Sequence, residues 1–321
     1  ARQLIELSSD SPVLHDRAKA FLDEIENPRP PPAWQREDQK RSEKARRKQA
    51  SNLASWRLFW RELDNDPETA FSVDKIDNTT WNLWRAMAKD ASDRSFAGWN
   101  RGFIERVFDK TMADRFRTAL AAAWRKDRPT LKSERPPEER NSYLMRWRMG
   151  LAGLYAEAED ASWAVRLTAE EADLACRYAL IDLSRLPPWL DAVIQVHPTV
   201  VDAAIGNELS AELEDTDEKH ASLLQEISNT STPIVSFFLP RIRTWLKAVL
   251  ADQDTAVAGM DKVGRAITLL LEHGLAEDAA DVLDVGRMRL QGTPDPSETK
   301  FWLPILARLD PAECVDTMER L

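Results

Sequence analysis

The stretch TAEEADLACRYALIDLSRLPP, residues 168–188, holds the signals that decide the fold of this chain. Thr168 and Glu171 have the spacing of a capping box, in which the hydroxyl accepts an orphan backbone amide and the carboxylate reaches back to the cap. Leu174, Tyr178 and Ile181 follow at helical spacing. Pro187-Pro188 ends the helix, because proline lacks the backbone N–H. The stretch therefore predicts one amphipathic helix with a defined start and stop.

Apolar residues at spacings of three and four recur on both sides of this stretch, with prolines or Asn and Asp residues between the periodic segments. A helix is expected to start at Ser11-Pro12, and another is expected to be capped by Asn78 or Thr79. Further helices are expected over residues 33–63, 96–108, 112–124, 143–155, 189–194, 200–213, 223–227, 234–250, 257–271 and 276–290, and a proline-bearing segment, 293–321, completes the chain.

Glycine is scarce: the 321 residues include 10 glycines but 12 tryptophans. Tight hairpins and strand bulges depend on glycine, and no segment alternates with a period of two between turn glycines. These features predict an all-α fold. Short connections and breaks every 20 to 40 residues indicate an irregular α-solenoid-like array of antiparallel helix pairs, preceded by a long charged helix.

Four segments are predicted. Residues 1–27 form an N-terminal helix, and residues 28–66 form a proline-rich linker followed by the long charged helix. Residues 67–166 form a tryptophan-rich helical subdomain, and residues 167–321 form a subdomain resembling helical repeats. Because the chain begins at Ala1 and not at Met, we expect it to be a piece of a longer polypeptide.

Bulk charge and cysteine content narrow the class of protein. The net charge of −10 argues against a surface built mainly for nucleic acid or anionic lipid. Cys176 and Cys314 are expected to be reduced, buried residues, which fits a cytoplasmic protein. No apolar run approaches the roughly 20 residues that span a bilayer, so no membrane partner is expected.

Two basic segments are the candidate contact sites for a partner or a nucleic acid. The first, residues 35–48, has almost no apolar residue, and the second is the proline-bearing stretch around residues 125–135. Trp34 and Trp302 lie beside prolines near the two ends and are predicted to contact a partner, whereas Trp56, Trp60, Trp84, Trp99, Trp124 and Trp147 are expected in the core. The basic candidates are Arg41, Arg46, Arg47, Lys48, Arg125, Lys126, Arg128, Lys132 and Arg135.

No residue pattern points to catalysis, a cofactor or a metal. The chain has no phosphate-binding loop, dinucleotide fingerprint or nucleophile elbow, and its four histidines are scattered. Asp160, Asp191 and Asp202 are not positioned as a catalytic pair. From about Asp202 onward we expect an acidic helical surface, carrying Glu208, Glu212, Glu214, Asp215, Asp217 and Glu218.

Several short motifs carry a family resemblance. They are Trp81-Asn82-Leu83-Trp84, Trp124-Arg125 with Leu131-Lys132-Ser133-Glu134-Arg135-Pro136, Gly150-Leu151-Ala152-Gly153-Leu154 with Ala156-Glu157-Ala158, and Pro187-Pro188-Trp189-Leu190 leading to Glu208-Leu209. From Trp81 to Leu213 the chain resembles the helical region downstream of the nucleotide-binding domain in large bacterial NACHT/STAND-type ATPases. The resemblance implies a sensor or scaffold piece of a bacterial antiviral-defence NTPase. It supplies no active-site residue, because the phosphate loop is missing.

Three functions remain open at this point. The first is a non-catalytic protein-interaction, sensor or regulatory module that binds a protein partner or the rest of a larger polypeptide. The second is a nucleic-acid-binding helical protein that uses the 35–48 and 125–135 segments. The third is an enzyme of an unrecognised helical class, which would require a pocket of clustered polar groups with perturbed pKa values.

Overall fold

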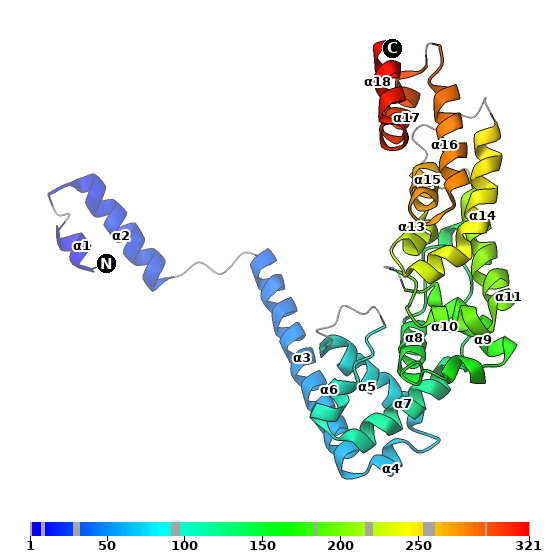
Figure 1. Ribbon diagram of the computed structural model, residues 1–321. Helices are drawn as coiled ribbons and strands as arrows, with labels where there is room; N and C mark the ends of the chain where they lie inside the picture. Colours follow the sequence, from blue (N-terminus) through cyan, green and yellow to red (C-terminus); the bar gives the residue numbers. More distant parts are fainter. Residues whose placement is uncertain are drawn as a thin grey trace. The chain divides into compact units, whose positions relative to one another are not determined.

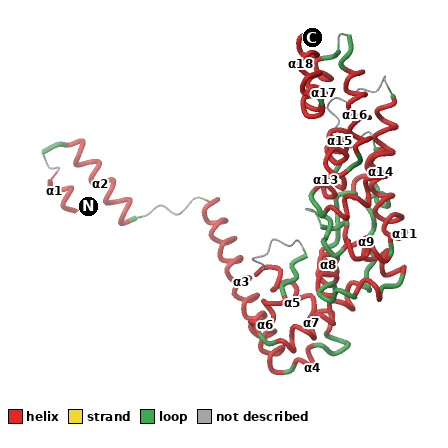
Figure 2. The backbone as a smooth tube through the Cα atoms, in the orientation of Figure 1, coloured by secondary structure: helices red, strands yellow, loops and turns green. Residues whose placement is uncertain are grey.

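The computed structural model describes residues 2–7, 10–27, 33–90, 97–182, 185–215, 221–252, 261–292 and 294–320. Within these ranges every regular element is a helix and there is no strand, which confirms the all-α prediction (Figure 2). The chain divides into two compact units, Ala1–Pro67 and Glu68–Leu321. The predicted segment boundary at 66/67 lies next to this division, whereas those at 27/28 and 166/167 fall inside a unit.

The first unit contains three helices, α1 (Arg2–Leu7), α2 (Pro12–Glu26) and α3 (Ala33–Asn65). α2 begins at the predicted Ser11-Pro12 signal, with the proline at its first position. It buries no residue, and its apolar residues Val13, Leu14 and Phe21 are more than half exposed. The predicted proline linker, residues 28–32, lies outside the described residues. α3 is one unbroken helix over the predicted range, and the rings of Trp56 and Trp60 stack within it with centroids 6.0 Å apart.

The second unit consists of helices joined by short turns. In chain order they are α4 (Pro67–Ala70), α5 (Ile76–Asp90), α6 (Arg101–Val107), α7 (Lys110–Trp124), η1 (Pro137–Glu139), α8 (Met145–Glu157), η2 (Trp163–Arg166), α9 (Ala169–Ala179), α10 (Leu190–Val196), α11 (Pro198–Val201), the π-helical turn η3 (Asp202–Gly206), α12 (Asn207–Glu214), α13 (Ser222–Ser228), α14 (Thr232–Ala251), α15 (Asp261–His273), α16 (Ala276–Arg289), α17 (Pro296–Leu309) and α18 (Pro311–Arg320).

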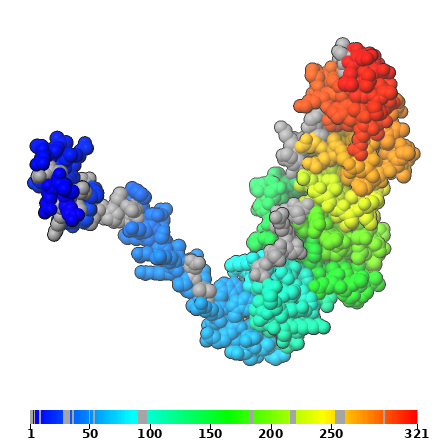
Figure 3. Space-filling view, turned by 60° about the vertical axis from the view of Figure 1, so that its left-hand side comes forward, coloured from blue at the N-terminus to red at the C-terminus, as the bar shows by residue number. Residues whose placement is uncertain are grey.

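Neighbours in sequence are mostly neighbours in space in this unit. α7 packs on α8, α14 on α15, α16 on α17, and α17 on α18 (Figure 1). In the space-filling view, successive stretches of the chain form successive bands of surface from residue 68 onward (Figure 3). Some contacts skip elements, as where α10 meets α14 and α13 meets α15. A regular solenoid of antiparallel pairs stays a prediction.

Helix starts follow local hydrogen bonding. The capping box of α9 is confirmed, because the Glu171 amide donates to Thr168 Oγ1 at 3.2 Å and the Thr168 amide donates to Glu171 Oε2 at 3.0 Å. The prediction that Asn78 or Thr79 caps a helix is wrong, since α5 already begins at Ile76. The Thr79 hydroxyl instead donates to the carbonyl oxygen of Ala70 at 2.6 Å.

Tryptophans fill much of the core of the second unit. Trp84, Trp124 and Trp147 are buried as predicted, whereas Trp99, like Trp56 and Trp60 of α3, is only partly buried. Trp302 is fully buried and donates to Glu298 Oε2 at 2.8 Å. Its predicted contact with a partner is therefore wrong: the proline beside it lies within α17 and does not expose the ring. Cys176 and Cys314 are free and buried, as expected.

Two glycines let helices come close together. α8 presents Gly153 to the backbone of α7 at Leu120, and it presents Gly150 to the ring of Tyr178 on α9. A Cβ atom at either position would overlap its neighbour. α8 thus packs against both α7 and α9, and the loop between α7 and α8 lines a cavity together with α12 and α13. Across the described ranges no helix is both long and apolar enough to cross a membrane.

Candidate ligand cavity

Three of the predicted basic contact residues hold the second unit together. Arg125 stacks over the Trp124 ring at 4.2 Å and makes ion pairs with Glu157 at 2.8 Å and Glu171 at 2.6 Å. Lys126 makes an ion pair with Asp77, and Arg128 makes one with Asp173. Asp173 also pairs with Arg177 on α9. The positive charge of residues 125–128 is therefore largely balanced by carboxylates of the same unit.

Arg135 shapes the loop in which it lies. Its guanidinium group lies over the Trp147 ring at 5.4 Å and donates to the carbonyl oxygens of Arg140 and Ser142 at 3.3 and 2.5 Å. It also donates to Thr130 Oγ1 at 2.9 Å. Burial in this position lowers the pKa of Arg135. Arg135 thus fixes the conformation of the 130–143 loop from within.

The basic candidates on α3 are arranged differently. Arg41, Arg46, Arg47 and Lys48 are exposed, and none of them makes an ion pair with another described residue. Lys40, Lys44, Arg47 and Lys48 recur at the i, i+4, i+7, i+8 spacing that places side chains on one helix face. Trp34, at the start of α3, is 70% exposed. These residues belong to the first unit, and Lys132 and Arg135 belong to the second.

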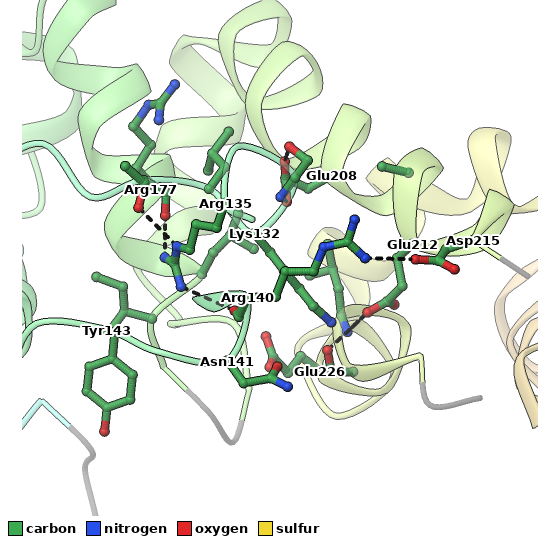
Figure 4. A pocket seen from close by; sticks show the side chains of 18 residues that line it. Lys132, Arg135, Arg140, Asn141, Tyr143, Arg177, Glu208, Glu212, Asp215 and Glu226 are labelled. Atoms are coloured by element: carbon green, nitrogen blue, oxygen red, sulfur yellow. Dashed lines mark hydrogen bonds and ion pairs between the residues drawn. The ribbon is translucent and has the colours of Figure 1, made fainter. Parts of the chain in front are cut away.

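A cavity of about 500 Å³ lies where the 130–143 loop faces the end of α9, α12 and the start of α13 (Figure 4). Positive and negative side chains line it in equal number. The cationic ones are Lys132, Arg135, Arg140 and Arg177, and the carboxylates are Glu208, Glu212, Asp215 and Glu226. Leu131, Leu180, Ile181 and Leu223 supply apolar parts of the wall. The cavity therefore joins charge of both signs to an apolar surface.

Among the described residues, hydrogen bonds and an ion pair tie the loop to α12. The backbone amide of Ser133 donates to Glu208 Oε2 at 3.1 Å, and the hydroxyl of Ser133 donates to the other oxygen of the same carboxylate. Arg140 makes an ion pair with Asp215 at 3.2 Å. At the opposite wall the loop is held to α9, where the guanidinium group of Arg177 donates two hydrogen bonds, of 2.8 and 2.9 Å, to the carboxylate of Glu134. Arg177 lowers the pKa of Glu134.

Glu212 has a structural role. Its carboxylate accepts hydrogen bonds from the backbone amides of Leu223 and Leu224, each at 2.9 Å, and so caps the first turn of α13. Lys262 of α15 donates to the carbonyl oxygens of Leu213 and Asp215 at the C-terminal end of α12, at 3.0 and 2.5 Å. The end of α12 and the start of α13 are thereby anchored.

The prediction of a wholly surface-lying acidic segment after Asp202 is wrong for Glu208 and Glu212. Both are buried, at 8% exposure, because their carboxylates are used as hydrogen-bond acceptors for Ser133 and for the start of α13. Asp217 and Glu218 lie outside the described residues. Asp160 and Asp202 do not share a site: the first bonds Ser162 and Arg166, and the second pairs with Arg241.

Two polar groups at the cavity lack a hydrogen-bond partner. The Nε atom of Arg140 is buried and has none. The carboxyl group of Glu226 accepts and donates no hydrogen bond among the described residues. Burial raises the pKa of Glu226 to about 8, and the nearby negative charges of Glu212 and Asp182 add to this effect while Lys132 opposes it. A buried atom without a partner, such as Arg140 Nε, is uncommon in folded proteins.

Sequence reasoning identified Lys132 and Arg135 but missed Arg140, Glu208 and Glu226. No local signal distinguishes Glu226 from any other glutamate on an amphipathic helix. In the parts of the chain that the structure describes, no group of three or more His, Cys, Asp or Glu residues is arranged to hold a metal ion. No family model, curated protein or solved structure matches this chain.

Proposed function

We propose that this chain is a non-catalytic sensor or regulatory helical module, and that its ligand occupies the cavity between the 130–143 loop and α12–α13. The observation that carries the proposal is the cavity itself, whose wall combines apolar, cationic and acidic side chains. Its volume of about 500 Å³ falls in the range of small-molecule sites, which combine apolar walls with a few placed polar groups.

The way in which the loop is held supports a regulatory role. The loop is fixed to α9 through Arg177 and Glu134, but its link to α12 consists of the Ser133–Glu208 hydrogen bonds and the Arg140–Asp215 ion pair. A ligand that competes for these carboxylates or completes this link shifts the population of loop positions. The resemblance to the helical region of STAND-type ATPases also supports a sensor, with a protein partner or the rest of a larger polypeptide receiving the signal.

The absence of an evident catalytic arrangement on the cavity wall supports a binding role over an enzyme. The hydroxyl of Ser133 is bonded to Glu208, but that carboxylate also accepts the amide of the same serine. This double contact is the geometry of a loop attachment. Glu212 and Asp215 are likewise engaged, with the α13 amides and with Arg140.

A thermal-shift experiment tests the ligand site. A panel of amino acids, dipeptides, nucleotides, sugar phosphates and carboxylic acids, each at about 1 mM, is added to the protein, since millimolar binders are detectable at that concentration. Ala211 lines the cavity at an exposed position on α12, so Ala211→Trp should obstruct the cavity with little effect on folding. Ala280→Trp, at an exposed position on α16, is the matched control.

We expect at least one class of compound to raise the melting temperature of the wild type and of Ala280→Trp, but not that of Ala211→Trp. If no compound stabilises the protein, or if Ala211→Trp responds as strongly as the wild type, the cavity is not a ligand site.

A second candidate function is nucleic-acid binding by α3, favoured by the exposed Lys40, Lys44, Arg47 and Lys48 stripe. Cations in a row along a helix contact successive phosphates and release counterions, which makes affinity fall steeply with salt. Fluorescence anisotropy with a labelled single-stranded RNA and a DNA duplex at about 50 mM salt tests this function.

Lys44→Glu, Arg47→Glu and Lys48→Glu combined should abolish nucleic-acid binding. Lys75→Glu, Lys110→Glu and Lys300→Glu combined change the net charge equally at exposed positions of the second unit and should leave binding intact. Equal losses in the two triple variants would show a nonspecific charge effect and reject α3 as the site.

A further inference from the structure

Helix α2 carries an apolar stripe that is largely open to solvent. Leu14, Phe21 and Ile25 are 56%, 52% and 55% exposed. Together with Ala18 they follow one another at alternating spacings of four and three residues, which places all four side chains along one line of the helix. An exposed stripe with this spacing is typical of a helix that pairs with another helix.

Helix α1 leaves this stripe uncovered. It packs beside α2, where His15 Nδ1 lies 3.2 Å from the carbonyl oxygen of Ile5 (Figure 1). His15 and Leu22 lie on one side of the stripe and are partly buried, and no residue of α2 is fully buried. The stripe and its other flank are therefore open to a further helix.

This open flank carries one charge of each sign. Arg17 and Glu24 are seven residues apart and so lie on the same side of α2, Arg17 nearer its start and Glu24 nearer its end. Both side chains are exposed, and neither makes a hydrogen bond or an ion pair with another described residue. The charge thus changes sign along the flank.

A second α2 helix that runs antiparallel to the first matches the apolar stripe. When Leu14 of one copy lies opposite Ile25 of the second copy, Phe21 lies opposite Ala18. The largest side chain of the stripe then packs on the smallest, which fills the space between the two helices. A parallel pair would instead place Phe21 against Phe21.

The same alignment pairs the flanking charges. Arg17 of each copy lies beside Glu24 of the other, and the twofold symmetry of the pair produces two equivalent ion pairs. A parallel pair in register leaves these charges at opposite ends. A membrane is a poorer match, because α2 has four Asp or Glu and two Lys or Arg residues, whereas helices that lie on membranes are rich in Lys and Arg.

We propose that two copies of this chain associate by antiparallel pairing of their α2 helices, with Leu14, Ala18, Phe21 and Ile25 as the interface. The proposal goes beyond the proposed function and does not depend on the cavity, which lies in the second unit. A helix of 15 residues offers a small interface, so we expect a dissociation constant on the order of 10 µM.

Analytical ultracentrifugation of the full chain at about 1, 10 and 100 µM tests the association. The average mass of the wild type should rise with concentration toward twice that of the monomer. Phe21→Glu places a charge in the middle of the stripe and should weaken the association at least about tenfold. Ala20→Glu adds the same charge at the neighbouring exposed position, outside the stripe, and should associate as the wild type does.

Exchange of the flanking charges tests the orientation. Arg17→Glu and Glu24→Arg each place like charges beside one another in the antiparallel pair, so each should weaken the association at least about threefold at low salt. The two substitutions combined restore both ion pairs and should restore the association. Because these exposed positions lie outside the stripe, they test the interface even if Phe21→Glu unfolds α2.

A wild type that is monomeric at every concentration overturns the proposal, as does equal association of the wild type and Phe21→Glu, or equal loss in Phe21→Glu and Ala20→Glu. If neither charge substitution alone has an effect, the antiparallel pairing is overturned. Sedimentation with phosphatidylcholine and phosphatidylserine vesicles tests the other occupant: vesicle binding that Phe21→Glu removes, by a protein that is monomeric in solution, would assign the stripe to a membrane. None of these outcomes bears on the thermal-shift test of the cavity.

Discussion

Glu226 couples its protonation to folding. Its pKa is raised to about 8 in the folded protein by burial and by Glu212 and Asp182, with Lys132 acting in the opposite direction. In the unfolded chain a glutamate titrates near its ordinary value, so between these two values the folded state holds a proton that the unfolded state has lost. The contribution of Glu226 to stability is therefore complete at low pH and is lost as the pH rises to about 8.

Glu226→Gln should abolish this pH dependence, because glutamine resembles the protonated acid and does not titrate. We expect the wild type to lose on the order of 3 kcal/mol relative to Glu226→Gln between pH 5 and pH 8. Urea unfolding of both proteins at the two pH values measures this difference. Parallel pH dependence of the wild type and the variant would show that Glu226 ionises normally.

Asp278 offers a second test at the residue scale. Its buried carboxylate accepts from Arg243 Nε at 2.5 Å, from Arg243 Nη2 at 2.8 Å and from the Leu275 amide at 2.8 Å, which joins α14 to the start of α16. Asp278→Asn leaves the Arg243 charge without its partner and should cost about 3 kcal/mol in the free energy of unfolding.

The same pair of helices supplies the control for Asp278. Lys247 of α14 and Asp281 of α16 form an ion pair of 2.7 Å with both side chains about half exposed. Asp281→Asn should cost less than about 1 kcal/mol, since water screens an exposed pair. Chemical denaturation compares the two variants, and equal losses would contradict the argument from burial.

At the scale of elements, Gly153 allows α7 and α8 to pack closely. A side chain there would overlap the carbonyl oxygen of Leu120 and approach the ring of Trp124, so α7 and α8 would have to separate. Gly153→Ala should therefore destabilise the protein by about 1–3 kcal/mol, the usual cost of overpacking.

Gly102 is the matched position for this test. It lies in α6, is exposed, and has only Asn100 Oδ1 within ordinary van der Waals distance of an added Cβ. Gly102→Ala should be neutral or stabilising by up to about 1 kcal/mol, because alanine favours the helix. Thermal unfolding of both variants distinguishes overpacking from helix propensity, and a stable Gly153→Ala protein would contradict the packing.

Regular elements follow from local signals, which is why most of them could be predicted. The capping box at Thr168 and the proline at the start of α2 act within a few residues, and helical spacing of apolar residues marks the buried face. The start of α5 was mispredicted because Thr79 bonds Ala70, a residue outside the helix. Trp302 was mispredicted for a related reason, since its burial depends on the packing of α16 and α17.

At the scale of the whole molecule, the exposure of α2 leads to a prediction about stability. α2 buries no residue, so its removal takes no packed side chain from the protein. A variant lacking residues 1–27 should unfold with a melting temperature within about 2 °C of that of the full chain. Differential scanning calorimetry provides the measurement, and a loss of several degrees would show that α2 contributes to the fold.

The sequence by itself determined that this protein is built of helices, that its cysteines are buried and free, and where α2 and α9 begin. These properties depend on composition and on interactions between residues a few positions apart. Only the tertiary structure decided which charged side chains form ion pairs and which line a cavity. Arg140 and Glu226 line the same cavity although they are 86 positions apart in the printed sequence. Their separation along the chain does not predict that they line one cavity, because the cavity is created by the packing of α9, α12 and α13 against one loop.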